Sequence, residues 1–255
     1  MIIRINKCGQ DGIAPTVRAV RGFSLIEMAV VLFVITMLIG SLLVPLATQV
    51  EQRQISETQK ALEEIRESLL GFAVANGYLP CPDKTVGGGA GIANDGVEDW
   101  SGAACVAPNE GNVPWVTLGV GGSDPWGNRF RYQVSALYAQ RPSTFTLSSA
   151  AAIQVCTVAA CTPASTQLTS GSPNGAVAVI ISLGKNGFGA INAVTGTANP
   201  APTSADENQN LTGPNTFVSR NITTAGTGVG EFDDIVVWLP RFTLFNRMVA
   251  AGKLP

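Results

Sequence analysis

Histidine is absent from the 255 residues of this chain. Its absence excludes the Ser-His and Cys-His pairs of many hydrolases and every metal site that needs an imidazole ligand. Charged residues are also scarce, at 13% of the chain, and the formal net charge is −2. Nucleic-acid binding normally requires a basic cluster, and the chain after residue 22 is acidic and contains none. We therefore expect neither an enzyme nor a nucleic-acid partner.

One long uncharged run is the most prominent feature that is present. Residues 28–50 contain no charged side chain, and as a helix they would be roughly 34 Å long, enough to cross a bilayer. The first 22 residues carry a net charge of +3, so this basic flank predicts a cytoplasmic N-terminus with the bulk of the chain on the other side. Glu27, at the edge of the run, is unfavourable there by up to a few kcal/mol and indicates a partner or a function.

The residues before the run carry a resemblance to a known family. Gly22, Phe23 and Glu27, in the segment G-F-S-L-I-E, resemble the processing site of type IV prepilins and type II secretion pseudopilins. The resemblance implies that a prepilin peptidase cuts after Gly22 and methylates Phe23. It also implies that Glu27 meets the N-terminal amine of a neighbouring subunit during assembly. Such a pair, about 4 Å apart, attracts by roughly 4 kcal/mol at an effective dielectric constant near 20.

An exported chain meets an oxidising compartment, where cysteines form disulfides. One of the five cysteines, Cys8, lies in the predicted leader, and the other four can pair in three ways. Cysteines close in sequence close their loops with the least loss of entropy, which favours Cys81 with Cys105 and Cys156 with Cys161. A zinc site is the alternative, but a lone C-x4-C spacing supports it poorly.

Periodicity and the resemblance together predict the fold class. We expect an α+β, type IV pilin-like fold, in which a long N-terminal helix (a membrane span plus an amphipathic half) packs on a mostly antiparallel β-sheet head. The predicted domains are a leader peptide (1–22), a transmembrane or filament-core helix (23–50), an amphipathic helix half (51–76) and a globular periplasmic or extracellular head (77–255). Alternating or apolar runs predict strands at 130–134, 145–148, 153–158, 176–183 and 232–239, and a short amphipathic helix over 241–253. The segment D-P-W-G-N at 124–128 resembles one that follows the helical stem of pseudopilins.

Calcium is the one cofactor for which the sequence offers candidates. Calcium takes six to eight oxygen ligands, and major pseudopilins hold it in a C-terminal loop that this chain resembles loosely in place and composition. A solvated loop with acids that cap turns is the alternative. The candidate ligands are Asp206, Glu207, Asp233 and Asp234, and a weaker second group is Asn94, Asp95, Glu98 and Asp99.

The resemblance implies a structural subunit, a minor pilin or a pseudopilin, of a type IV pilus or a type II secretion filament. The implied partners are prepilin peptidase, other pilin or pseudopilin subunits, the inner membrane and its assembly platform. The implied location is a single pass through the inner membrane with a periplasmic head, and later a filament. The alternative is a monomeric, signal-anchored periplasmic binding module or adhesin, which would keep an intact N-terminus.

Overall fold

A computed structural model describes residues 22–106, 110–226, 228 and 230–254, without the side chains of 41–47. The predicted leader therefore lies outside the described residues, except for Gly22. The chain divides into two compact units, Met1–Val50 and Glu51–Pro255.

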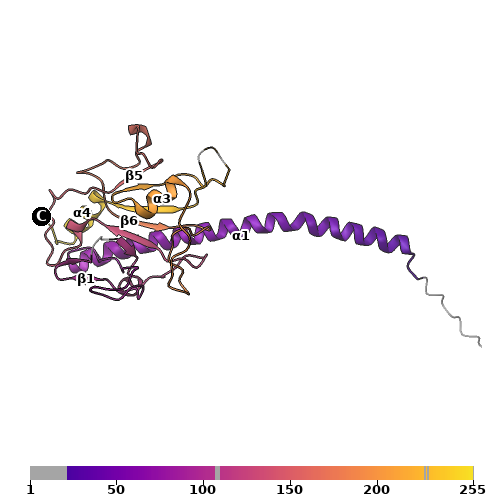
Figure 1. Cartoon of the computed structure of the whole chain (residues 1–255), viewed down its shortest axis with the longest axis horizontal. Helices are drawn as coiled ribbons and strands as arrows, with labels where there is room; N and C mark the ends of the chain where they lie inside the picture. Colours follow the sequence, from indigo (N-terminus) through magenta and orange to yellow (C-terminus); the bar gives the residue numbers. More distant parts are fainter. Residues whose placement is uncertain (1–21, 107–109, 227, 229, 255) are drawn as a thin grey trace, which may run out of the picture. The chain divides into compact units, whose positions relative to one another are not determined.

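Helices and short strands alternate along the described chain. Helix α1 is the longest element, and most of the others have fewer than eight residues. The elements are α1 (Leu25–Asn76), β1 (Trp100–Ser101), β2 (Ala104–Cys105), β3 (Glu110–Asn112), α2 (Trp115–Leu118), β4 (Arg131–Val134), η1 (Ala136–Tyr138), β5 (Gln154–Cys156), η2 (Ala164–Thr166), β6 (Ala176–Ser182), α3 (Ala205–Thr212), β7 (Thr216–Val218), β8 (Ile235–Pro240) and α4 (Arg241–Ala250) (Figure 1).

The fold class predicted from the sequence is wrong in two respects. No helix among the described residues is long and apolar enough to cross a membrane, so the long apolar helix of a pilin-like fold is not shown. The described strands, moreover, form several separate sheets, two of them antiparallel and one parallel, where the sequence predicted one mostly antiparallel sheet.

The second unit is built on the C-terminal part of α1. Leu62, Ile65 and Leu69 follow one another at steps of three and four residues and are almost fully buried, as expected for one face of an amphipathic helix. The helix ends at Asn76, and the next residue, Gly77, has a φ of +87°, in the left-handed region that favours glycine. Figure 1 shows β6 beside this part of α1, and the two elements share a hydrophobic cluster.

Strand β6 separates two hydrophobic cores. It is an inner strand of an antiparallel sheet of order β3-β4-β6-β8, and all of its residues are buried. Ile180 packs in the cluster that contains Leu69 of α1, whereas Val179 and Ile181 pack in a second cluster with Phe217. Because neighbouring side chains of a strand point to opposite faces, β6 contributes to both cores.

The remaining strands form two small sheets, and each sheet contains one cysteine of a disulfide. Strands β1 and β2 are an antiparallel pair, and β5 and β7 are a parallel pair. Cys81 is joined to Cys105 with 5.2 Å between their Cα atoms, and Cys156 is joined to Cys161 with a Cα separation of 5.4 Å. These are the two pairs that proximity in the sequence favours.

The Ile180→Ala substitution is expected to lower the free energy of unfolding by about 2 to 5 kcal/mol, because it leaves a cavity in a closed core. Ile180 is fully buried, whereas Ile222 is 48% exposed, so Ile222→Ala is the matched control and should change the stability by less than about 1 kcal/mol. Urea unfolding of both variants measures the difference. Equal losses of unfolding free energy in the two variants would show that Ile180 is not packed in a core.

Candidate functional site

The start of α1 has reciprocal hydrogen bonds between two of the residues in the G-F-S-L-I-E segment. The Ser24 backbone N–H donates to Glu27 Oε2 at 2.8 Å, and the Glu27 backbone N–H donates to Ser24 Oγ at 3.2 Å. This is a capping box, which satisfies two backbone donors that a helix start otherwise leaves unpaired. Glu27 therefore has a local structural role that the sequence analysis did not identify.

The residues that precede and follow this cap are exposed. Gly22 and Phe23 lie outside α1, and the Phe23 side chain is 80% exposed. Thirteen large apolar side chains between residues 23 and 39 are exposed in the isolated chain, among them Leu25, Phe33 and Met37. Soluble monomers rarely expose a contiguous apolar surface of this extent, and such a surface indicates contact with a membrane or with other protein.

Three of the four predicted calcium ligands lie together in the second unit. The carboxylates of Glu207, Asp233 and Asp234 each place an oxygen within 4.8 Å of the other two. Helix α3 supplies Glu207, and the two aspartates come directly before β8. Glu207 and Asp234 are buried, with 2% and 5% exposure. We call these three residues the carboxylate cluster.

Two asparagines support the carboxylate cluster. Asn186 donates from its side chain to Glu207 Oε1 at 3.0 Å and from its backbone to Asp233 Oδ2 at 2.8 Å. Asn210 donates to Asp234 Oδ2 at 2.8 Å. The sequence analysis missed both asparagines, although Asn210 lies three residues after Glu207, which places the two on one face of a helix.

The carboxylates of the cluster are costly to ionise in the absence of a cation. Burial is the largest effect and raises the pKa of all three, most strongly that of Asp234. Repulsion from neighbouring carboxylates raises them further. Glu207 Oε2 and Asp233 Oδ1 are buried without a hydrogen-bond partner among the described residues.

The carboxylate cluster fits a calcium ion. Buried oxygens without partners are the ligands that a hard cation requires, and two oxygens on opposite sides of a calcium ion at about 2.4 Å are about 4.8 Å apart. The three carboxylates would supply the charge, and water would complete the coordination shell. The ion would offset the repulsion among the three carboxylates and would give the two unpaired oxygens a partner.

The other predicted ligands lie elsewhere. Asp206 forms an ion pair with Arg220, at 2.7 Å, and therefore does not join the carboxylate cluster. Asp99 in the second group accepts the backbone N–H groups of Lys84 and Ile92, at 2.8 and 3.1 Å. Glu98 and Asp95 likewise accept backbone N–H groups, those of Cys81 and Val97, so the acids of this second group bind backbone amides.

Comparisons with models of protein families, with curated proteins and with solved structures find no match to this chain. The likeness of the G-F-S-L-I-E segment to prepilin processing sites thus remains a resemblance of sequence. The carboxylate cluster and the helix start are interpreted from their own residues.

Proposed function

We propose that this chain is a structural subunit of a filament of the type IV pilus or type II secretion class, a minor pilin or a pseudopilin. Its precursor is processed at the inner membrane by a prepilin peptidase, which cuts between Gly22 and Phe23. The processed chain then assembles with other subunits through the N-terminal part of α1. Glu27 meets the new amine of a neighbouring subunit at that stage.

The observation that carries the proposal is the exposed start of α1. A peptidase requires an accessible, non-helical bond, and Gly22 and Phe23 are exposed and precede the first helical residue. The apolar side chains that follow are exposed in the isolated chain. Neighbouring subunits in a filament would bury them, and this burial would stabilise the assembly by about 25 cal/mol per Å² of apolar surface. The G-F-S-L-I-E resemblance supports the same function independently of any likeness of fold.

Processing is tested by the intact mass and the N-terminal sequence of the chain purified from cells with and without a prepilin peptidase. We expect an N-methylated chain that begins at Phe23, only when the peptidase is present. The Gly22→Leu substitution should slow cleavage by about tenfold or more, a barrier increase of about 1.4 kcal/mol. Gly40→Leu is the matched control, because neither glycine has a heavy atom within 4 Å of an added Cβ.

Two outcomes would contradict the proposal. A chain that stays intact with an active peptidase would favour the monomeric, signal-anchored binding module. Cleavage of Gly22→Leu at the rate of the unsubstituted chain would show that the peptidase does not recognise this site.

A second candidate function is calcium binding by the carboxylate cluster. The specific observation in its favour is the pair of buried carboxylate oxygens without partners among the described residues, on Glu207 and Asp233. Calcium would join α3 to the start of β8 and so stabilise the second unit. This function does not depend on processing or on filament assembly.

A further inference from the structure

A pocket of about 380 Å³ lies in the second unit, beside the carboxylate cluster. Asn186 and Asp233 line it and also belong to or support that cluster. The other walls come from segments far apart in sequence: the first turns of α1 in this unit, the turn around Trp126, and the chain shortly before β8. The volume is within the usual range for a small-molecule site, about 300 to 1,000 Å³.

Three separate segments give the pocket apolar walls. Ile55 lies on α1, Trp126 in the turn before β4, and Ile222 in the loop before β8. Ile222 is 48% exposed. The Trp126 Nε1 has no accessible surface, so the accessible part of its indole ring is carbon. An aromatic ring attracts a cation through its face, so these walls suit an apolar body that carries a positive charge.

The charged side chains of the pocket leave an excess of negative charge. Its lining contains three acids and one cation. The cation, Lys185, is paired with Glu51 at 3.2 Å, so these two charges offset each other. Asp233 already accepts the Asn186 backbone N–H through Oδ2, and its Oδ1 is buried. Glu231 is therefore the acid that a ligand in the pocket can reach.

Glu231 is both accessible and unpaired. Its side chain is half-buried, and it has no ion pair or hydrogen bond in the part of the chain that the structure describes. Its oxygens are not among the buried oxygens without partners, so they are open to solvent. A ligand ammonium group could therefore bind the Glu231 carboxylate without displacing a partner or entering a closed core.

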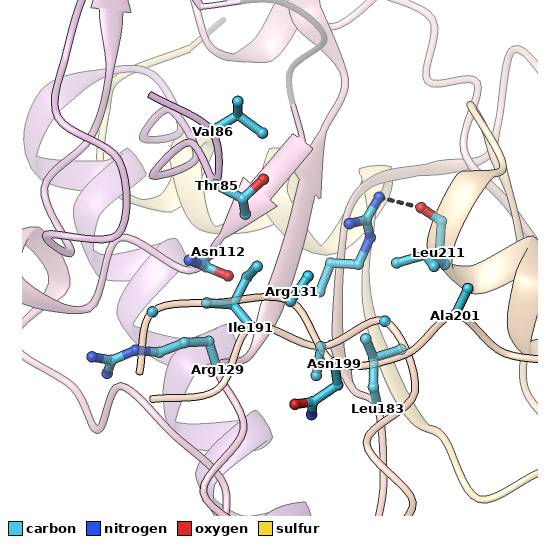
Figure 2. Close-up of a pocket in the computed structure, with 14 residues that line it drawn as sticks. Thr85, Val86, Asn112, Arg129, Arg131, Leu183, Ile191, Asn199, Ala201 and Leu211 are labelled. Atoms are coloured by element: carbon cyan, nitrogen blue, oxygen red, sulfur yellow. Dashed lines mark hydrogen bonds between the residues drawn. The ribbon is translucent and has the colours of Figure 1, made fainter. Parts of the chain in front are cut away.

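A second cavity, of about 370 Å³, lies beside Arg131 and differs in this respect (Figure 2). Arg131 Nη2 donates to Glu110 Oε2 at 2.9 Å and to the Leu211 carbonyl at 2.6 Å, the latter drawn as the dashed line in Figure 2. The Arg129 guanidinium stacks on Trp115, 3.9 Å from the ring centroid, and points away from the labelled apolar side chains. The charged groups of that cavity are thus already partnered.

We propose that the pocket beside the carboxylate cluster binds an organic ammonium ion with an apolar body, whose N–H groups donate to the Glu231 carboxylate. The apolar body lies against Ile55, Trp126 and Ile222. A free amine offers this chemistry, and so does the lysine side chain of a peptide, whose methylene stem is apolar. The proposal does not depend on the processing of the chain, on its assembly or on calcium.

The test measures the change in thermal unfolding temperature of the full-length chain with added 2-phenylethylammonium, from which a Kd follows by linkage. A chelator in the buffer removes calcium, so the result is independent of the calcium site. Two related probes separate the parts of the ligand: 2-phenylethanol has the body without the charge, and methylammonium has the charge without the body. We expect each to bind at least about tenfold more weakly than 2-phenylethylammonium.

The source of the ammonium group is distinguished with two blocked peptides. Acetyl-Ala-Lys-Ala-amide presents a lysine side chain, and acetyl-Ala-Gln-Ala-amide lacks the charge. Binding of the lysine peptide as tight as that of the free amine, with the glutamine peptide at least about tenfold weaker, would assign the pocket to a peptide. Binding of the free amine alone would assign it to a small molecule.

Two pairs of variants locate the ligand. Glu231→Gln should weaken binding of 2-phenylethylammonium by at least about tenfold. Glu64→Gln removes the same charge from an exposed position outside the lining and should retain affinity within about twofold. Ala225 lines the pocket and is exposed, so Ala225→Trp should also weaken binding by about tenfold or more. Its control, Ala201→Trp, fills the cavity of Figure 2 instead and should keep the affinity.

Matched variants in one detergent cancel any partition of the probe into micelles. The proposal would be overturned by an affinity that is unchanged in Glu231→Gln, or by an alcohol that binds as tightly as the ammonium ion. Weaker binding in Ala201→Trp with full affinity in Ala225→Trp would place the ligand in the other cavity, which would equally contradict the proposal.

Discussion

Glu27→Gln is expected to reduce filament assembly by at least about tenfold while the start of α1 stays intact. Glutamine can replace glutamate in a capping box, so the hydrogen bond from the Ser24 N–H to the side chain at position 27 is retained. The charge is lost, and with it an attraction to a neighbouring amine of up to roughly 4 kcal/mol at an effective dielectric constant near 20. Loss of about 1.4 kcal/mol already gives the tenfold effect.

Ser24→Ala is the matched variant, because it removes the other half of the capping box and keeps the carboxylate. The lost bond from the Glu27 N–H to Ser24 Oγ should destabilise the helix start by about 1 kcal/mol. Assembly should nevertheless stay near that of the unsubstituted chain. Both variants are compared by quantifying subunits in sheared filaments and the cleaved, methylated chain in membranes. If Ser24→Ala assembled as poorly as Glu27→Gln, Glu27 would act through the cap and not through its charge.

The carboxylate cluster makes the stability of the second unit depend on pH, and calcium should reverse the direction of this dependence. Without calcium, the pKa values of Glu207, Asp233 and Asp234 are raised in the folded state. A raised pKa stabilises the fold below the unfolded pKa, near pH 4, and this stabilisation is lost as the pH rises through the folded pKa. Asp83, with a pKa raised to about 7 by burial, adds a loss between about pH 4 and pH 7.

Calcium binds the deprotonated carboxylates, so its stabilising effect grows as the pH rises. The measurement is the free energy of urea unfolding in calcium minus that in a chelator, at each pH. Contributions from Asp83 are the same in both buffers and cancel. We expect a difference near zero at about pH 4 and of about 2.7 kcal/mol near neutral pH, when the calcium concentration is about 100 times Kd.

Two variants locate the ion. Glu207→Gln should abolish the calcium-dependent difference and also stabilise the calcium-free chain near neutral pH, because a buried charge and its repulsion are removed. Asp206→Asn lies outside the carboxylate cluster and should keep the difference, although it loses the ion pair with Arg220. A difference that persists in Glu207→Gln, or that is absent from the unsubstituted chain, would contradict the calcium site.

The sequence predicts best those elements whose signal is local. The run 176–183 is apolar at nearly every position, which indicates a strand buried on both faces, and it forms the inner strand β6. The amphipathic pattern over 241–253 forms α4. The predicted strand over 145–148 is absent: Phe145 is a single buried anchor against Tyr138 and Phe245, and the chain then turns locally at Thr146, whose N–H is bound by Ser149 Oγ.

Features that depend on distant contacts were not predictable in the same way. Asp206 and Glu207 belong to one polar segment in the sequence, but α3 directs Glu207 inward and Asp206 towards Arg220. The serine at 204 before a short polar run was the signal for that helix. The cavity beside Arg131 combines segments that are far apart along the chain, and hydrophobic periodicity carries no information about such partners.

Because β6 contributes side chains to both cores, we expect the two cores to open together. The amide hydrogens of β6 should therefore exchange with solvent only when the whole second unit unfolds. Cys81 and Cys105 lie in one of these cores, and Cys156 is buried in the β5–β7 pair beside the other. A reductant or an oxidant should thus reach both disulfides in the same unfolded population, and both bonds should become protected in a single cooperative step.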